Sequence, residues 1–226
     1  MPMSEEVTVT CPKCGKTGSF TLWTSLNIAA DLYPEKKAQV LDGSLFQYPC
    51  PQCGKKTWAE YRMLYNHNED KVMVYAEPDY SPAHQPMIQE LMDTLTADGY
   101  VVRVVPNINS LREKVLIFDD GLDDRIIEIN KLYMLVAMIQ DGDEHLKAPG
   151  GCKMYYAGGK GVKNLLITAD GVPDLTVDIS GLYKELAIPK VLEHLPPLEK
   201  SGPVIDRAWA AEYCNATKAL KEHGCL

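Results

Sequence analysis

The feature that most constrains this chain is a five-residue pattern that occurs twice, as CPKCG at Cys11–Gly15 and as CPQCG at Cys50–Gly54. Proline fixes φ at about −65° at the start of each pattern, and glycine accepts the positive φ that ends such a turn. Each pattern therefore predicts a tight turn that directs two sulfur atoms toward one point. Together the two turns supply four thiolates, which is the ligand set of a tetrahedral metal site.

The predicted metal ligands are Cys11, Cys14, Cys50 and Cys53. Zinc is the expected ion, and iron is the alternative, because both metals occupy tetrahedral sulfur sites. Four protein ligands leave no position for water, so the site is expected to be structural. Turn amides are expected to donate to the sulfurs. Four lysines lie close in sequence to the cysteines and are expected to offset the negative charge of the thiolates: Lys13, Lys16, Lys55 and Lys56.

A thioredoxin-like redox motif is another interpretation of the sequence C-P-x-C. In that motif the second cysteine enters a helix within a βαβ unit. Here glycine follows the second cysteine of both pairs, and the pattern occurs twice. Redox catalysis is therefore disfavoured.

Charge and composition are those of an acidic soluble protein. The 226 residues carry a formal net charge of −8, and no segment is strongly basic, which disfavours nucleic acid as the main partner. The N-terminal residues MPMSEEVTVT contain two acids and no apolar core, so they are not expected to act as an export signal. The longest apolar run, Leu132–Ile139, is shorter than the about 20 residues that cross a bilayer. A cytoplasmic location, reduced thiols and no membrane partner are expected.

Residues 1–80 are predicted to form a zinc-ribbon module, in which one ion clamps two hairpins. A period-two pattern at residues 20–28 predicts a strand after the first turn. Pro34 and Gly43 bound a short helix inserted between the hairpins. After the second turn, two runs predict one strand each: residues 56–65 and residues 71–77.

Residues 81–226 are predicted to be a mixed, largely helical remainder, which makes the whole chain α+β. One strand is expected at residues 100–106, and an antiparallel patch is expected from Cys152 onward. The first helix is expected to carry an apolar face of Met87, Leu91 and Leu95. Helices are predicted at residues 87–99, 108–121, 122–142 and 179–187, and from Pro203 onward.

Residues 132–139 are apolar on every side of their predicted helix. Such a segment is expected to be buried, either in the core or at a contact between two copies of the chain. A homodimer is therefore one form that the protein is expected to take.

Several ordered blocks of the sequence resemble the CpXC family, a set of bacterial and archaeal proteins named for this cysteine pattern. Besides the two turns, these blocks are WTSLN, LDGSLFQYPC, LYNHNEDKVMVY and LREKVLIFDDGLDDRIIEI. The resemblance covers about residues 7–130. It implies that the four cysteines, which match the family motif position by position, are the metal ligands. It implies no activity, because the biochemical function of the family is uncharacterised.

An acidic cluster between two predicted helices is the alternative site for a divalent metal and for catalysis: Asp119, Asp120, Asp123 and Asp124. The cluster lacks the acid spacing and the distal glutamate of an EF-hand loop. Acidic residues also stabilise the first turn of a helix, so helix termini are the favoured explanation.

Other polar residues are expected to have no role in a site. His67 follows the second turn, but four thiolates already complete a tetrahedron. The glycine-rich residues 157–161 lack the phosphate-loop pattern. Three further cysteines have no catalytic signature near them: Cys152, Cys214 and Cys225.

The sequence leaves three hypotheses for function. The favoured one is a binding or assembly module with a structural metal, which binds an unknown protein partner or associates with a second copy of itself. The second is nucleic-acid or transcription-linked binding through the zinc ribbon, which the lysines favour and the net charge opposes. The third is an enzyme with a divalent metal at Asp119–Asp124, and the absence of a catalytic motif disfavours it.

Overall fold

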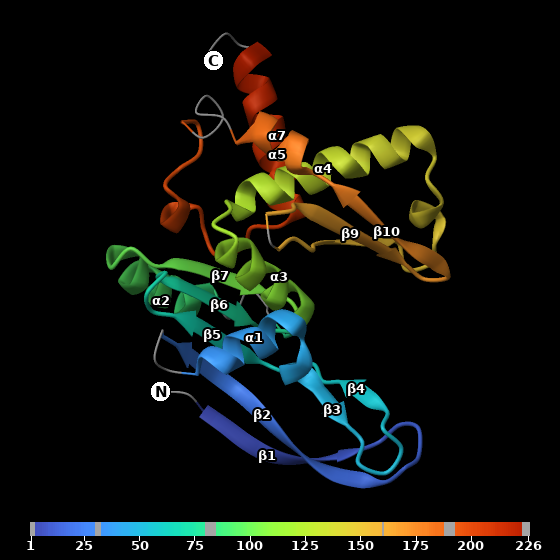
Figure 1. The fold of residues 1–226 in the computed structure, drawn as a ribbon. Coiled ribbons are helices and arrows are strands. Elements are labelled where there is room, and N and C mark those ends of the chain that lie inside the picture. The colour runs from blue at the N-terminus through green and yellow to red at the C-terminus, as the bar shows by residue number, and fades with distance from the viewer. Residues whose placement is uncertain (1–2, 30–32, 80–84, 160, 188–192, 223–226) are drawn as a thin grey trace. The chain divides into compact units, whose positions relative to one another are not determined.

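The structure is a computed structural model of the chain, and it describes residues 3–29, 33–79, 85–159, 161–187 and 193–222 (Figure 1). The chain divides into two compact units, Met1–Val115 and Leu116–Leu226. Both units combine helices with strands, which confirms the α+β prediction. The domain boundary predicted at residue 80 lies inside the first unit and stays a prediction.

A five-stranded mixed sheet forms the centre of the first unit, in the order β1-β2-β5-β6-β7. Its strands are β1 (Met3–Thr10), β2 (Thr17–Ile28), β5 (Met63–His67), β6 (Val72–Ala76) and β7 (Val101–Val105). The pairs β1–β2 and β5–β6 are antiparallel, and the pairs β2–β5 and β6–β7 are parallel. Because β7 follows residue 80, the remainder that was predicted to be largely helical contributes a strand to this sheet.

The inserted helix has the bounds that the sequence predicts. α1 (Pro34–Asp42) has proline in its first turn, and Gly43 ends it with φ 81°. A short 3-10 helix, η1 (Ser44–Phe46), leads into β3 (Gln47–Pro49), which pairs antiparallel with β4 (Lys56–Trp58). The single strand predicted at residues 56–65 is wrong, because β4 and β5 belong to different sheets.

α2 (Gln85–Ala97) connects the parallel strands β6 and β7, which need such a crossover. It packs on the sheet through a buried cluster of Met73, Ile88, Met92, Val102 and Val104. Leu95 of the predicted apolar face packs against this cluster. The side chains of Met87 and Leu91 lie outside the described part of the structure.

The second unit contains a three-stranded antiparallel sheet in the order β10-β9-β8, which is the antiparallel patch that the sequence predicts. α3 (Ile108–Asp119) crosses the boundary between the units. The other elements are α4 (Asp124–Asp141), η3 (Glu144–Lys147), β8 (Cys152–Tyr156), β9 (Asn164–Ala169), β10 (Val172–Asp178), α5 (Ser180–Leu186), η4 (Leu198–Lys200) and α7 (Arg207–Glu222). With these strands and β7, residues 81–226 are not largely helical, and that part of the prediction is wrong.

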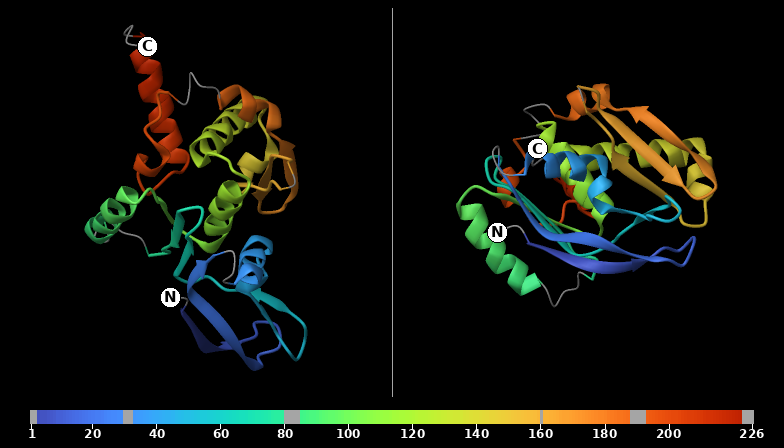
Figure 2. Two further views of the ribbon diagram at one scale, coloured as in Figure 1. Left: turned by 60° about the vertical axis from the view of Figure 1, so that its left-hand side comes forward. Right: turned by 60° about the horizontal axis from the view of Figure 1, so that its bottom comes forward.

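α4 contributes to two apolar clusters of the second unit. On one side Ile127 packs with Ile117, Tyr156, Leu165 and Ile179. On the other side Ile126 and Ile129 pack with Leu195 and Ala210, and α7 lies beside α4 (Figure 2). α7 begins at Arg207 and not at Pro203, because the Asp206 side chain accepts from Trp209 N at 2.9 Å and caps the helix there.

The apolar second half of α4 is largely exposed. Tyr133, Val136 and Ile139 are 52%, 45% and 60% exposed, and Met138 is buried. The buried half of the helix is instead residues 124–131, which include four charged side chains. The expectation that residues 132–139 lie in the core is therefore wrong for these three side chains.

Candidate metal centre

The first cysteine pair lies in the turn between β1 and β2. Cys11 N donates to Lys16 O at 2.9 Å, and Gly15 N donates to Cys11 O at 2.9 Å. Gly15 has φ 70°, a left-handed conformation that strains any residue with a Cβ. The turn therefore curls its backbone back on itself, as its proline and glycine predict.

The second pair lies in the turn between β3 and β4 and repeats this geometry. Cys50 N donates to Lys55 O, and Gly54 N donates to Cys50 O, both at 2.9 Å. Gly54 has φ 69°. A Cβ on either turn glycine would meet no atom within 4 Å, so the backbone angle, not lack of space, requires glycine. The repeated sequence pattern is thus a repeated structure.

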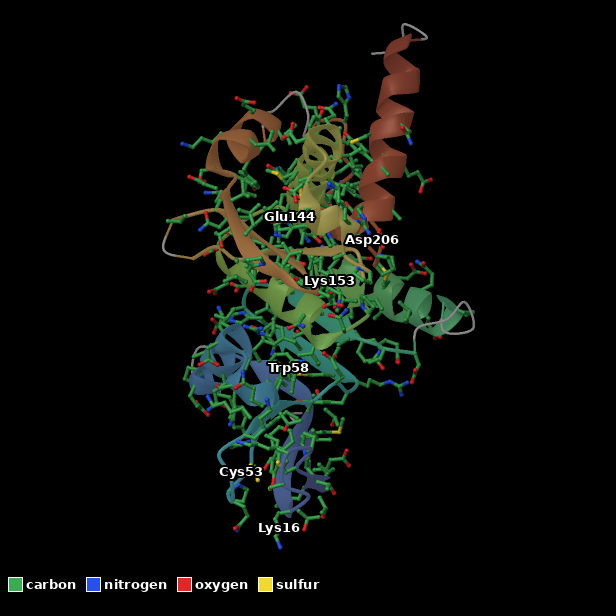
Figure 3. The ribbon with its side chains drawn as sticks, turned by 90° about the vertical axis from the view of Figure 1, so that its right-hand side faces the viewer. Lys16, Cys53, Trp58, Glu144, Lys153 and Asp206 are labelled. Carbon is green, nitrogen blue, oxygen red and sulfur yellow. The ribbon has the colours of Figure 1, made fainter. Side chains whose placement is uncertain are left out.

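The two turns meet at one end of the first unit, where both hairpins finish (Figures 1 and 2). Figure 3 labels Cys53 of one hairpin and Lys16 of the other at this end. We call this region, residues 9–18 and 48–57, the cysteine end.

The four sulfur atoms have the spacing of ligands around one ion. Cys11 Sγ lies 3.7 Å from Cys53 Sγ, and Cys14 Sγ lies 3.6 Å from Cys50 Sγ. All four ligand atoms lie within 4.8 Å of one another. Sulfurs placed tetrahedrally at about 2.3 Å from one ion are about 3.8 Å apart, whereas disulfide sulfurs are about 2.05 Å apart. The donor set and its spacing therefore fit a tetrahedral thiolate site.

Turn amides donate to the sulfurs, as expected. The amides of Cys14 and Lys13 donate to Cys11 and lower the pKa of that thiol. Burial opposes the ionisation of Cys50, but two amides of its own turn and the neighbouring thiols lower its pKa to about 6. The Lys16 amide donates to Cys14, yet desolvation and the neighbouring thiols raise the pKa of Cys14 to about 12. The thiols therefore share their protons unequally, and a bound cation would replace those protons.

A small apolar cluster surrounds the sulfurs and includes Tyr48, which the sequence pattern did not single out. Its members are Cys11, Tyr48 and Cys50, with Val9, Phe20 and Cys53 packed against them. The Tyr48 ring meets the Phe20 ring edge-on at 6.0 Å. A Cβ on Gly18 would collide with the Tyr48 hydroxyl. The sequence does carry one signal for Tyr48: it precedes Cys50 by two residues, a spacing that puts both on one face of a strand.

The four aspartates Asp119, Asp120, Asp123 and Asp124 do not form a second metal group. Asp120 accepts a hydrogen bond from the Tyr156 hydroxyl at 2.7 Å. Asp123 caps α4 by accepting from Arg125 N at 2.9 Å, and it pairs with the guanidinium of Arg125. Asp124 is buried in the first turn of α4. In the part of the chain that the structure describes, the four cysteines are the one cluster suited to a metal.

The remaining candidates lie apart from the cysteine cluster. His67 ends β5, and its Nδ1 accepts from Asp70 N at 3.2 Å. Cys152 lies in β8, and Cys214 lies on α7, where burial raises the pKa of its thiol. Cys225 lies outside the described residues. Within the described residues, no helix has both the length and the apolar character that crossing a membrane requires.

Comparison with known proteins gives one match. The model of a protein family described as CpXC protein matches residues 9–131, which is more than half of the chain and includes all four cysteines of the cluster. No curated protein and no solved structure matches the chain.

Proposed function

Because the chain belongs to the CpXC family, we propose that its namesake cysteines bind one structural zinc ion in a zinc-ribbon arrangement. The proposed ligands are Cys11, Cys14, Cys50 and Cys53. The protein then acts as a cytoplasmic binding or assembly module and not as an enzyme. The spacing of 3.6 and 3.7 Å between sulfurs of opposite turns is the observation that supports this proposal most directly.

The small size of the second hairpin supports a structural role for the ion. β3 and β4 have three residues each, and a two-stranded sheet of that size is marginal in water. An ion with two ligands from each hairpin ties this small sheet to β2 and so to the five-stranded sheet. With all four positions filled by protein, the ion has no open position for a substrate or water. Zinc also has no redox chemistry of its own, which suits a purely structural ion.

Elemental analysis of the purified protein tests the metal assignment. We expect about one zinc per chain, with Cys50→Ser reducing it strongly and Cys152→Ser leaving it unchanged. Cys152→Ser is the matched control, because it makes the same chemical change in β8, outside the cluster. Stoichiometric iron with a red colour would show that the bound metal is iron and not zinc. Protein that contains no metal after purification under reducing conditions would overturn the proposal.

Self-association through α4 is the form of assembly that we propose. Tyr133, Val136 and Ile139 are spaced by three residues and exposed, so they form an apolar row along one helix. Two copies related by a twofold axis would place this row against its own equivalent. Sedimentation analysis over a range of concentrations tests this contact. We expect Val136→Asp to abolish dimers, and a wild-type chain that stays monomeric at high concentration would exclude it.

Nucleic-acid binding at the cysteine end is the second candidate, and one observation favours it. Residues 7–19 and 49–59 contain no acidic residue and carry four exposed lysines: Lys13, Lys16, Lys55 and Lys56. Four phosphate contacts would give a logarithmic salt slope of about −3 to −4. A gel shift at low ionic strength tests this. Retention that weakens with salt and is lost when these lysines become glutamine would support it, and no retention would exclude it.

A further inference from the structure

The two hairpins of the cysteine end differ in the cross-strand pair that begins two residues before the first cysteine of each turn. Val9 lies two residues before Cys11 in β1, and its cross-strand partner in β2 is Gly18. The equivalent position in the other hairpin is Tyr48, whose cross-strand partner in β4 is Thr57. The hairpins thus share their turns but not their packing, since one carries Tyr48 opposite Thr57 where the other carries Val9 opposite Gly18.

Tyr48 crosses from its own hairpin to the other one. Its hydroxyl occupies the space that a Cβ on Gly18 would need. Its ring packs against Phe20 of β2, and its side chain is 2% exposed. Tyr48 therefore sets how β3 lies against the β1–β2 hairpin, and with it the distance between the two cysteine pairs.

The Tyr48 hydroxyl is buried without a hydrogen-bond partner, and the Tyr48 side chain packs in one cluster with Cys11 and Cys50. A buried hydroxyl without a partner is costly, and native structures rarely leave one unsatisfied. A neutral thiol accepts hydrogen bonds only weakly. A metal-bound thiolate is anionic, and hydrogen bonds to charged acceptors are about twice as strong as neutral ones.

We propose that Tyr48 is a positioning residue of the metal centre, which aligns the two cysteine pairs and donates a hydrogen bond from its hydroxyl to the metal-bound Cys50 thiolate. The inference rests on the proposed metal site and adds to it an asymmetry between the pairs. Cys50 receives a side-chain donor, whereas Val9 offers none at the equivalent position beside Cys11. Gly18 is required because the Tyr48 hydroxyl takes the place of its side chain.

The test compares wild type with Tyr48→Phe, which removes the hydroxyl and keeps the ring. Tyr61→Phe is the matched control, because the Tyr61 hydroxyl is also buried but its ring packs on Phe46, away from the cysteine cluster. Each full-length protein is loaded with Co²⁺. The sulfur-to-cobalt charge-transfer band and the rate of metal removal by a chelator are then recorded.

For Tyr48→Phe we expect a band at lower energy, because a thiolate that loses a hydrogen bond gives up electron density more easily. We also expect metal removal to be about tenfold faster, the scale at which such supporting groups affect metal sites. Tyr61→Phe should match wild type in both measurements. If Tyr48→Phe also matches wild type, this inference is wrong while the metal site stands.

A wild-type protein that takes up no Co²⁺ would instead overturn the proposed function itself. Should Tyr48→Phe fail to fold, the ¹¹³Cd-substituted wild-type protein gives the answer by nuclear magnetic resonance. A slowly exchanging Tyr48 hydroxyl proton coupled to the cadmium through Cys50 supports the hydrogen bond, and a rapidly exchanging, uncoupled proton contradicts it.

Discussion

The cysteine end and the sheet of the second unit are both small antiparallel structures, yet different interactions stabilise them. The cysteine end buries only Cys11, Tyr48 and Cys50 in its cluster, and two of these are proposed metal ligands. The three-stranded sheet β8–β10 packs on α3 and α4 through five buried apolar side chains. A small β-structure needs either an apolar layer or a cross-link, and this chain uses one solution in each unit.

The largest effect is expected at the cysteine end, where the proposed ion cross-links the two hairpins. Cys50→Ser should remove the metal and unfold β3 and β4, because structural zinc contributes about 10 kcal/mol or more of binding free energy to such small elements. Amide hydrogen exchange should show protection lost in β3 and β4 and kept in β9. Cys152→Ser should leave both regions protected. An equal loss of protection in β9 would mean that the sheet of the second unit also depends on the metal.

A cavity in the apolar cluster of the second unit should destabilise that unit and leave the cysteine end unaffected. Leu165 is fully buried between the sheet and α4. Leu165→Ala should lower the free energy of unfolding of the second unit by about 2–5 kcal/mol. The metal content should not change. Denaturant unfolding and elemental analysis on the same sample check both, and metal loss in this variant would contradict the separation.

The turn glycines test whether the two cysteine turns are equivalent. Gly15→Ala and Gly54→Ala should each cost about 1 kcal/mol, because both positions have φ near 70° and neither lacks space. Gly181→Ala in α5 is the control, since alanine suits a helix and should stabilise by up to about 1 kcal/mol. Thermal unfolding with metal bound measures all three. Clearly unequal losses at the two turns would show that the repeat is not energetically symmetric.

The smallest expected effect concerns pH. His145 Nδ1 lies 2.7 Å from Asp143 Oδ1, and this hydrogen bond raises the pKa of His145. The His145 amide and ring lower the pKa of Asp143. The raised histidine pKa stabilises the fold below about pH 6.5 and its contribution is lost at higher pH, whereas the lowered aspartate pKa stabilises above about pH 3.9. The pair therefore contributes most between about pH 4 and 6.5.

The cysteine end should respond to pH in the opposite direction, because protons compete with the metal for the thiolates as pH falls. Unfolding of wild type and His145→Gln, measured at pH 5.5 and 8.5, separates the two responses. The difference between the two proteins should be larger at pH 5.5. A difference that grows toward pH 8.5 would reverse the sign derived for the pair.

Local chemistry explains which elements the sequence predicts well. The cysteine turns and α1 are determined by neighbouring residues: Pro34 and Gly43 give the helix its bounds, and the turn glycines have the positive φ that the pattern requires. The four sulfurs could be named as one candidate group because the two patterns are identical. Tyr48 was missed because its contact with Gly18 joins different hairpins, and no local pattern reports such a contact.

Non-local pairing explains the errors. The run at residues 56–65 has uniform strand character, but Ala59 N donates to Phe46 O and the chain then leaves β4 to join β5 to another sheet. In α4, the apolar character of residues 132–139 suggested burial, yet Tyr133, Val136 and Ile139 are exposed. Glu128 and Lys131 are buried because their side chains pair at 2.8 Å, which offsets much of the desolvation cost.

The length of β2 has a mechanical consequence. β2 has twelve residues, but it pairs with β5 only over Ser25–Ile28, so residues 17–24 extend past the parallel partner and have β1 as their strand partner. This overhang spans about 26 Å at the usual rise per residue. A two-stranded ribbon twists more readily than a wide sheet. The cysteine end therefore lies at the tip of a two-stranded ribbon. A force applied at this tip bends the ribbon before it disturbs the other three strands of the sheet.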